Sequence, residues 1–118
     1  MKDKDKILSQ KIIKYCSQIQ QTHDRFGDDE HEFYDDSCGF IYRNAISMPI
    51  QQIGELAKSY SDEFISEISD IPWKQIKGMR TYFAHEYDEM DIDVIWKTSH
   101  EEIDSLKEKL ERILNDKK

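Results

Sequence analysis

The sequence has few of the residues that build turns or break helices. It contains four glycines and two prolines among 118 residues, whereas sandwiches and barrels need many turn-forming positions. This shortage excludes a fold of many short strands and favours long helices with few connections. A chain of this length can bury one core, so we predict a single all-α domain over residues 1–118, built as an antiparallel bundle of four main helices plus short helices.

Cysteines and long hydrophobic runs are also scarce. Cys16 and Cys38 are the two cysteines, and without CxxC spacing we expect reduced thiols rather than a disulfide or a metal pair. No apolar run approaches the length of a membrane span, and the charged start of the chain has no apolar segment like that of a signal peptide. We therefore expect a cytoplasmic protein with no membrane association.

Positive charge is in short supply. The 17 Lys and Arg residues face 25 Asp and Glu residues, which gives a formal net charge of -8. General nucleic-acid binders neutralise phosphates with a broad basic face, and this composition excludes one. Any contact with RNA must therefore be local.

Apolar residues recur at steps of three and four positions, which predicts amphipathic helices. We place the main helices over residues 4–22, 38–60 and 73–85, and from about residue 92 into the polar tail. Residues 24–37 form a connection with at most a short helix. Pro49 lacks an amide proton and should kink the second main helix. Ser61 is placed to cap a short helix that ends at Ile68, and Pro72 suits the first turn of the helix after it.

The residues with the most chemical potential lie close together in the segment IPWKQIKGMRTYFAHEY, residues 71–87. Arg80 offers fixed donors that match phosphate, and His85 titrates near neutral pH and can act as a base or an acid. At about 100° per residue, an ideal helix would point His85 roughly 140° away from Arg80. The two side chains converge only if the helix ends near Ala84 or if His85 meets the partner subunit's Arg80. A surface ion-pair network with Glu86 or Asp88 is the structural alternative.

The spacing of Arg80, His85 and Tyr87 resembles the RxxxxHxY motif of HepT-like toxins in the HEPN superfamily. The resemblance extends upstream to QIGELAKSYSDEF and downstream to the aspartate-rich turn before Val94. It implies an all-helical homodimer that acts as the ribonuclease toxin of a type VII toxin–antitoxin pair. It also implies catalytic roles for Arg80 and His85, and a minimal nucleotidyltransferase antitoxin that attaches AMP to Tyr87.

A homodimer would also serve the chemistry. Metal-independent RNA cleavage needs a base, an acid and a cation near the phosphate, and one Arg–His pair supplies part of that set. A two-fold axis would bring two such pairs into one cleft and concentrate positive charge there. Tyr82 and Phe83, flanked by Trp73 and Trp96, exceed what a thin core needs. We therefore predict homodimerisation through the motif helix.

Other residues near the motif leave alternatives open. Family members commonly carry Asn or Asp where this chain has Thr81, which keeps a hydrogen-bonding group without the two-sided bonding of an amide. Lys77 and Lys74 could extend a phosphate-binding strip or be ordinary solvated lysines, and Glu55 is a candidate structural partner of Arg80. The alternative function is a catalytically weak HEPN module that dimerises and binds a nucleotidyltransferase partner or a nucleotide. A third is a helical interaction protein in which Arg80 and His85 stabilise the dimer.

One further group of residues contains metal-ligand types. These are His23, Asp24, Asp28, Glu30, His31 and Glu32. They lack HExxH or calcium-loop spacing, so we interpret them as a solvated acidic loop. We predict no metal and no other cofactor.

Overall fold

Helices make up all of the regular secondary structure in the described part of the chain. The computed structural model describes residues 1–84 and 92–116, with side chains described up to Gly78 and again from Ile92. The elements are α1 (Asp3–Arg25), α2 (Glu30–Tyr34), α3 (Gly39–Ala57), α4 (Asp62–Glu67), α5 (Trp73–Ala84), α6 (Ile92–Lys97), the π-helical turn η2 (Thr98–Glu102) and α7 (Ile103–Asp116). The predicted all-α class is confirmed.

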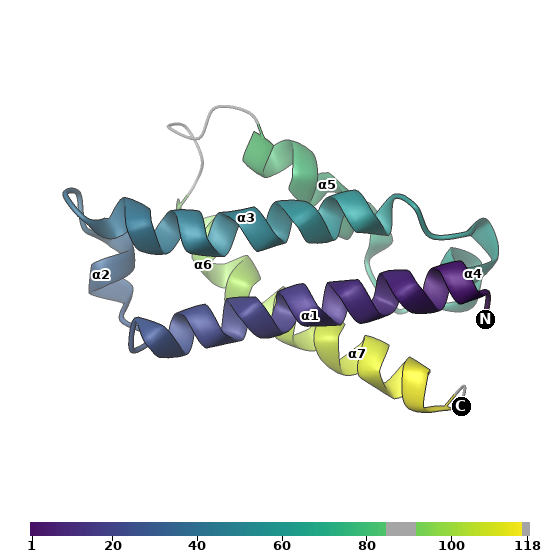
Figure 1. Ribbon diagram of the computed structural model, residues 1–118. Helices are drawn as coiled ribbons and strands as arrows, with labels where there is room; N and C mark the ends of the chain where they lie inside the picture. Colours follow the sequence, from purple (N-terminus) through teal and green to yellow (C-terminus); the bar gives the residue numbers. More distant parts are fainter. Residues whose placement is uncertain (85–91, 117–118) are drawn as a thin grey trace.

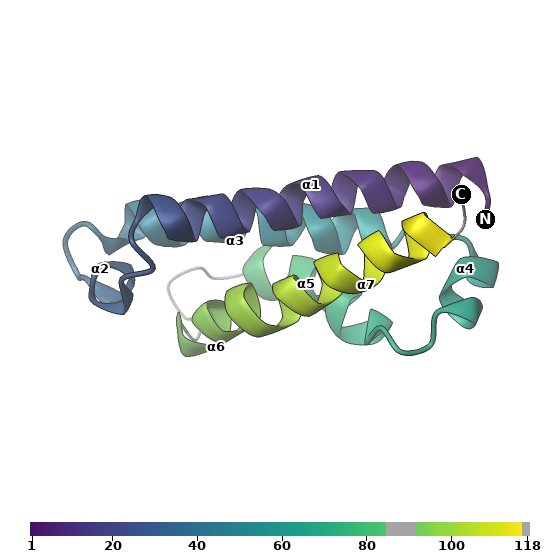
Figure 2. The ribbon, with the colours of Figure 1, turned by 90° about the horizontal axis from the view of Figure 1, so that it is seen from below.

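The four main helices are α1, α3, α5 and the continuous segment formed by α6, η2 and α7. In Figure 1, α1 and α3 run side by side in opposite directions, and α5 packs along α3. Figure 2 shows α7 crossing the face of α1 that lies away from the viewer in Figure 1. The short helices α2 and α4 lie at opposite ends of the α1–α3 pair. This arrangement matches the predicted antiparallel bundle.

Local chemistry sets several helix boundaries. The Ser61 hydroxyl accepts the Phe64 amide at 3.2 Å and caps α4, as predicted. The start of α3 lies against α2, because a Cβ on Gly39 would approach the carbonyl oxygens of Glu32 and Phe33 to 2.9 Å. Pro49 lies inside α3 and does not end it. The predicted boundaries of the second main helix are therefore confirmed within a few residues.

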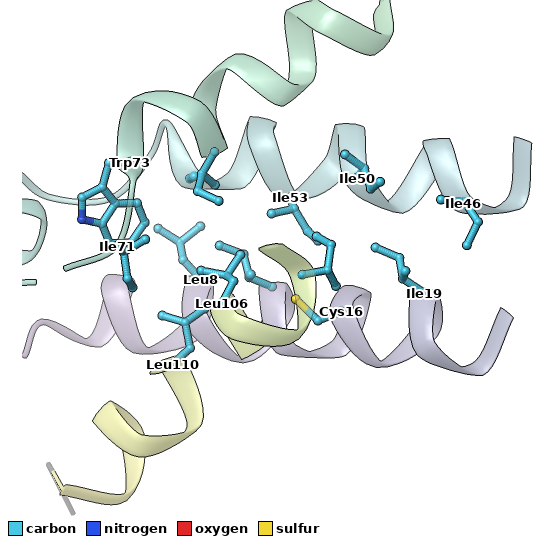
Figure 3. Close-up of a cluster of buried hydrophobic side chains, with 14 of the residues drawn as sticks. Leu8, Cys16, Ile19, Ile46, Ile50, Ile53, Ile71, Trp73, Leu106 and Leu110 are labelled. Carbon is cyan, nitrogen blue, oxygen red and sulfur yellow. The ribbon is translucent and has the colours of Figure 1, made fainter. Parts of the chain in front are cut away.

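The core consists of apolar stripes that face one another across the bundle (Figure 3). Isoleucine dominates, and Ile12, Ile46 and Ile53 have no exposed surface. Fully burying such a side chain stabilises a fold by about 1.5–3 kcal/mol. α3 also carries large apolar side chains that are exposed, among them Ile41 and Met48. None of the described helices is both long and apolar enough to cross a membrane.

Two buried polar contacts hold the start of α1 against the chain that leads into α5. The Asp5 carboxylate accepts hydrogen bonds from the Ser61 amide at 2.9 Å and from the Ser61 hydroxyl at 2.6 Å. One turn along α1, the hydroxyls of Ser9 and Tyr60 are 2.7 Å apart. Asp5 and Ser9 are almost completely buried, so these contacts replace the water that their polar atoms lose. They fix the position of α4, from which the chain continues into α5.

Candidate active site

The motif helix of the sequence analysis is α5, and its backbone carries Arg80 and Thr81. The side chains of these two residues are not among those described. His85 and Tyr87 lie outside the described residues, so their position relative to Arg80 stays a prediction. The structure therefore describes the segments on either side of the motif, which are the start of α5 and the helix α6.

The upstream flank, at the start of α5, is anchored by aromatic packing. Trp73 is 8% exposed, and its indole N–H donates to the Ile68 carbonyl at 2.7 Å. Its ring meets Tyr60 and Phe64 with centroids 5.0 and 5.8 Å away. Ile76, one turn further, is also buried. These contacts hold the first turns of α5 on the core and thereby set the direction in which the helix carries Arg80.

The supporting residues lie at different depths. Glu55 is exposed on α3, the helix against which α5 packs. Lys77 is half-buried and Lys74 is exposed. The predicted pairing of Glu55 with Arg80 is not tested, because the Arg80 side chain is not described. Lys77 is on the same helix as Arg80, which is what a phosphate-binding strip would require.

The downstream flank begins at α6 and is tied to α2. The Tyr34 hydroxyl donates to the Asp93 carboxylate. Trp96 packs on Phe33 at a centroid distance of 4.9 Å and on Tyr42 at 6.1 Å. The chain that follows the motif therefore packs against α2 and the start of α3 through Trp96. In Figure 1, α2 lies at the opposite end of the α1–α3 pair from α4, the short helix that precedes α5.

The two tryptophans that flank the aromatic residues of the motif helix pack within the protomer. Trp73 is buried and Trp96 is half-buried, so neither indole needs a second subunit to cover it. The predicted excess of aromatic surface belongs to Tyr82 and Phe83, whose side chains are outside those described. Homodimerisation through the motif helix therefore stays a prediction.

Two hollows of the described surface each contain two carboxylates in a lining that is otherwise mainly apolar or uncharged. One of about 270 Å³ lies between the start of α5 and α7, with Glu101 and Glu102 on its rim. The other, of about 410 Å³, lies beside α2 and includes Glu32 and Asp35. These carboxylates would repel a phosphate backbone that approached either hollow.

The predicted acidic loop is exposed to solvent, but most of it is helical. Asp24 lies in α1, and Glu30, His31 and Glu32 lie in α2. His23 was expected in the same solvated loop, but α1 extends to Arg25 and buries this ring to 6% exposure. His23 and Asp28 meet His100, a residue that the sequence analysis did not select. No local pattern could have identified it, since it lies 72 positions after Asp28.

Comparisons with known proteins add an independent line of information. A family model described as Ribonuclease HepT-like matches residues 12–113. A protein of Thermococcus cleftensis named "Probable ribonuclease HepT" is 35% identical over 81 residues, which cover 69% of this chain and 74% of that protein. A candidate RNase of Caldanaerobacter subterraneus subsp. tengcongensis is 35% identical over 78 residues, covering 66% of this chain and 70% of the relative. No solved structure matches the chain.

The family match gives the class of protein. Together with the all-α bundle, it identifies a HEPN-type domain. The chain belongs to the HepT-like ribonuclease family. The resemblance noted in the sequence is therefore confirmed at the level of the family.

Proposed function

We propose that this protein is the toxin of a type VII HepT/MNT toxin–antitoxin pair and cleaves RNA as a metal-independent endoribonuclease. The observation that carries the proposal is the match to the Ribonuclease HepT-like model across residues 12–113, which includes the whole RxxxxHxY segment. The names of the relatives, which include a ribonuclease HepT, support the reaction class.

The proposed reaction is an attack by the ribose 2′-hydroxyl on the adjacent phosphorus. The 2′-oxygen forms a new bond to phosphorus while the bond to the 5′-oxygen breaks, which leaves a 2′,3′-cyclic phosphate and a 5′-hydroxyl. His85 takes the proton of the 2′-hydroxyl or gives one to the departing oxygen. The Arg80 guanidinium binds the phosphate oxygens as they gain negative charge.

A homodimer completes the site in this proposal. Two motif helices around a two-fold axis supply one histidine as the base, the other as the acid, and two arginines for the phosphate. Sedimentation at micromolar concentration should show a dimer. A monomer that cleaves RNA at full rate would contradict the two-subunit site.

Expression toxicity and RNA cleavage test the catalytic residues. Arg80→Ala and His85→Ala should abolish growth inhibition and cleavage while the helical circular dichroism stays near that of the wild type. His31→Ala is the matched control, because His31 is exposed on α2, and it should remain toxic. Cleavage should persist in EDTA under conditions in which the circular dichroism is unchanged. Activity that requires an added divalent ion would remove the metal-independent mechanism.

Tyr87 is proposed as the point of control by a minimal nucleotidyltransferase antitoxin. AMP on this tyrosine would place a negative phosphate beside Arg80 and occupy space that RNA needs. Co-expression with the cognate transferase should add one or more AMP-sized masses to the wild type and none to Tyr87→Phe. Modification that persists in the Phe variant would exclude Tyr87 as the acceptor.

The second candidate is a catalytically weak HEPN module that dimerises and binds a nucleotidyltransferase or a nucleotide. Thr81 in place of Asn or Asp and the net charge of -8 favour it. A Thr81→Asn variant separates the two candidates. If Thr81→Asn cleaves RNA strongly and the wild type does not cleave it, the binding module is supported. If both proteins cleave RNA at similar rates, the enzyme is supported.

A further inference from the structure

Three side chains with metal-binding atoms meet where the end of α1 faces the η2 turn. His23 belongs to the last turns of α1, Asp28 to the loop that follows, and His100 to η2. The Asp28 carboxylate oxygen is 2.6 Å from His100 Nε2 and 3.6 Å from His23 Nδ1. One potential ligand atom from each of the three residues lies within 4.8 Å of the other two.

Unusual backbone on both sides brings these side chains together. Gly27 and Asp28 have φ angles of 70° and 53°, so the chain reverses through the left-handed region immediately after α1. The Asp28 amide donates to the His23 carbonyl at 2.7 Å, which holds the carboxylate near the ring. On the other side, η2 is a π-helical turn, a rare geometry that is frequent at functional sites. It directs the adjacent residues Ser99 and His100 toward His23.

Hydrogen bonds fix which ring nitrogens are available. His100 Nδ1 donates to the Trp96 carbonyl at 2.8 Å, so its Nε2 faces Asp28. The Ser99 hydroxyl donates to the same carbonyl at 2.8 Å and must accept from His23 Nε2 at 2.9 Å. His23 Nδ1 is then without a proton and accepts from the Tyr42 hydroxyl at 2.5 Å.

Both imidazoles thus have the support that metal-binding histidines usually have, in which the nitrogen away from the metal donates to a carbonyl or another fixed acceptor.

We infer that His23, Asp28 and His100 bind one divalent transition-metal ion of the zinc class. Two imidazoles and a carboxylate suit such ions, whose bonds of about 2.0–2.1 Å place tetrahedral ligand atoms about 3.3 Å apart. The separation of 3.6 Å between His23 and Asp28 already fits that geometry. The separation of 2.6 Å between Asp28 and His100 is that of a hydrogen bond and must widen when the ion replaces the shared proton.

The exposure of Asp28 and the hydrogen bond of Tyr42 determine how the three ligands can rearrange around an ion. The Asp28 side chain is 58% exposed, so its carboxylate can rotate toward the ion at little cost. The Tyr42 hydroxyl must release His23 Nδ1 or join the ligand set. Water from the exposed Asp28 side can complete a tetrahedral shell if Tyr42 does not. Such an ion would fasten the end of α1 to the start of the last helical segment, and it involves neither Arg80 nor His85.

Calorimetric titration of untagged, metal-stripped protein with Zn²⁺ tests the site. We expect one ion per chain, and Co²⁺ should give the intense visible bands of tetrahedral coordination. Mutating a residue that only orients a metal ligand typically weakens metal binding about 10–100-fold. His100→Gln and Asp28→Asn remove ligands themselves, so each should weaken Zn²⁺ binding by at least that factor. His31→Gln is the matched histidine control and should bind as the wild type does. His85→Gln should also bind normally, which separates this site from the proposed ribonuclease site.

The same titrations can overturn the metal-site proposal. If Zn²⁺ does not bind stoichiometrically to folded wild type, or if His100→Gln and Asp28→Asn bind it as tightly as the wild type, the cluster is an ion pair only. Asp28→Asn guards against a misleading loss through unfolding, since the residue is exposed and asparagine keeps a hydrogen-bonding side chain. Far-UV circular dichroism of each metal-free variant should overlay on that of the wild type.

Discussion

Replacing Asp5 tests whether the buried carboxylate holds the start of α1 against the chain that leads into α5. Asp5 is 1% exposed and accepts both the amide and the hydroxyl of Ser61. Hydrogen bonds to a charged group contribute about 1.5–3 kcal/mol each. Because the Ser61 hydroxyl keeps its bond to the Phe64 amide and can turn toward another acceptor, we expect Asp5→Ala to lower the free energy of unfolding by roughly 3 kcal/mol in total.

Asp3→Ala is the matched control for this variant. Asp3 lies in the same first turn of α1 and is exposed, so both variants lose a similar interaction with the helix dipole, about 0.3–1 kcal/mol. Urea denaturation followed by circular dichroism, at one fixed protein concentration in case of dimerisation, measures the difference. Asp5→Asn should fall between the wild type and Asp5→Ala, because the amide keeps one acceptor oxygen. Equal losses in Asp5→Ala and Asp3→Ala would refute the reasoning.

Further substitutions test the core, the motif helix and the cysteines. Ile53→Ala should lower the free energy of unfolding by about 2–5 kcal/mol, because the side chain is completely buried; urea denaturation would show it. Gly78→Ala should raise that free energy by roughly 0.5–1 kcal/mol, since an added Cβ would meet nothing within 4 Å, and destabilisation would contradict this. A thiol reagent should label exposed Cys38 in the native protein. Cys16 should react only on unfolding, because it is buried and burial raises its pKa to about 12. In the Cys38→Ser variant, Cys16 is the remaining thiol, so labelling of this variant in its native state would contradict the prediction.

The sequence predicted the elements whose signals are local. The spacing of Leu8, Ile12 and Ile19 on one helical face is enough to identify α1, and all three are buried. Ser61 and Pro72 mark helix starts through backbone chemistry that acts over a few residues. The length of α1 was underestimated because His23 continues the buried face with a polar side chain, which a hydrophobic pattern does not count.

Contacts between distant segments could not be predicted in the same way. The bonds of Asp5 to Ser61 depend on how α1 packs against α4, and nothing near Asp5 in the sequence signals burial. The meeting of His23 with His100 depends in addition on the π-helical turn, which shifts the register of the last helical segment by an amount that regular periodicity does not contain. For the candidate active site, the sequence selected Arg80 by family resemblance, and the structure adds how its helix is held.

The distribution of aromatic residues gives that support a physical basis. Large rings bury much apolar surface with few rotatable bonds, so they fix orientation at a low loss of conformational entropy. Among the described side chains they gather in two clusters, one around Trp73 at the start of α5 and one around Trp96 near the end of α6. The chain between them contains the RxxxxHxY segment. Its ends are therefore held by packing within one protomer, and a second subunit would be needed for chemistry rather than to cover either tryptophan.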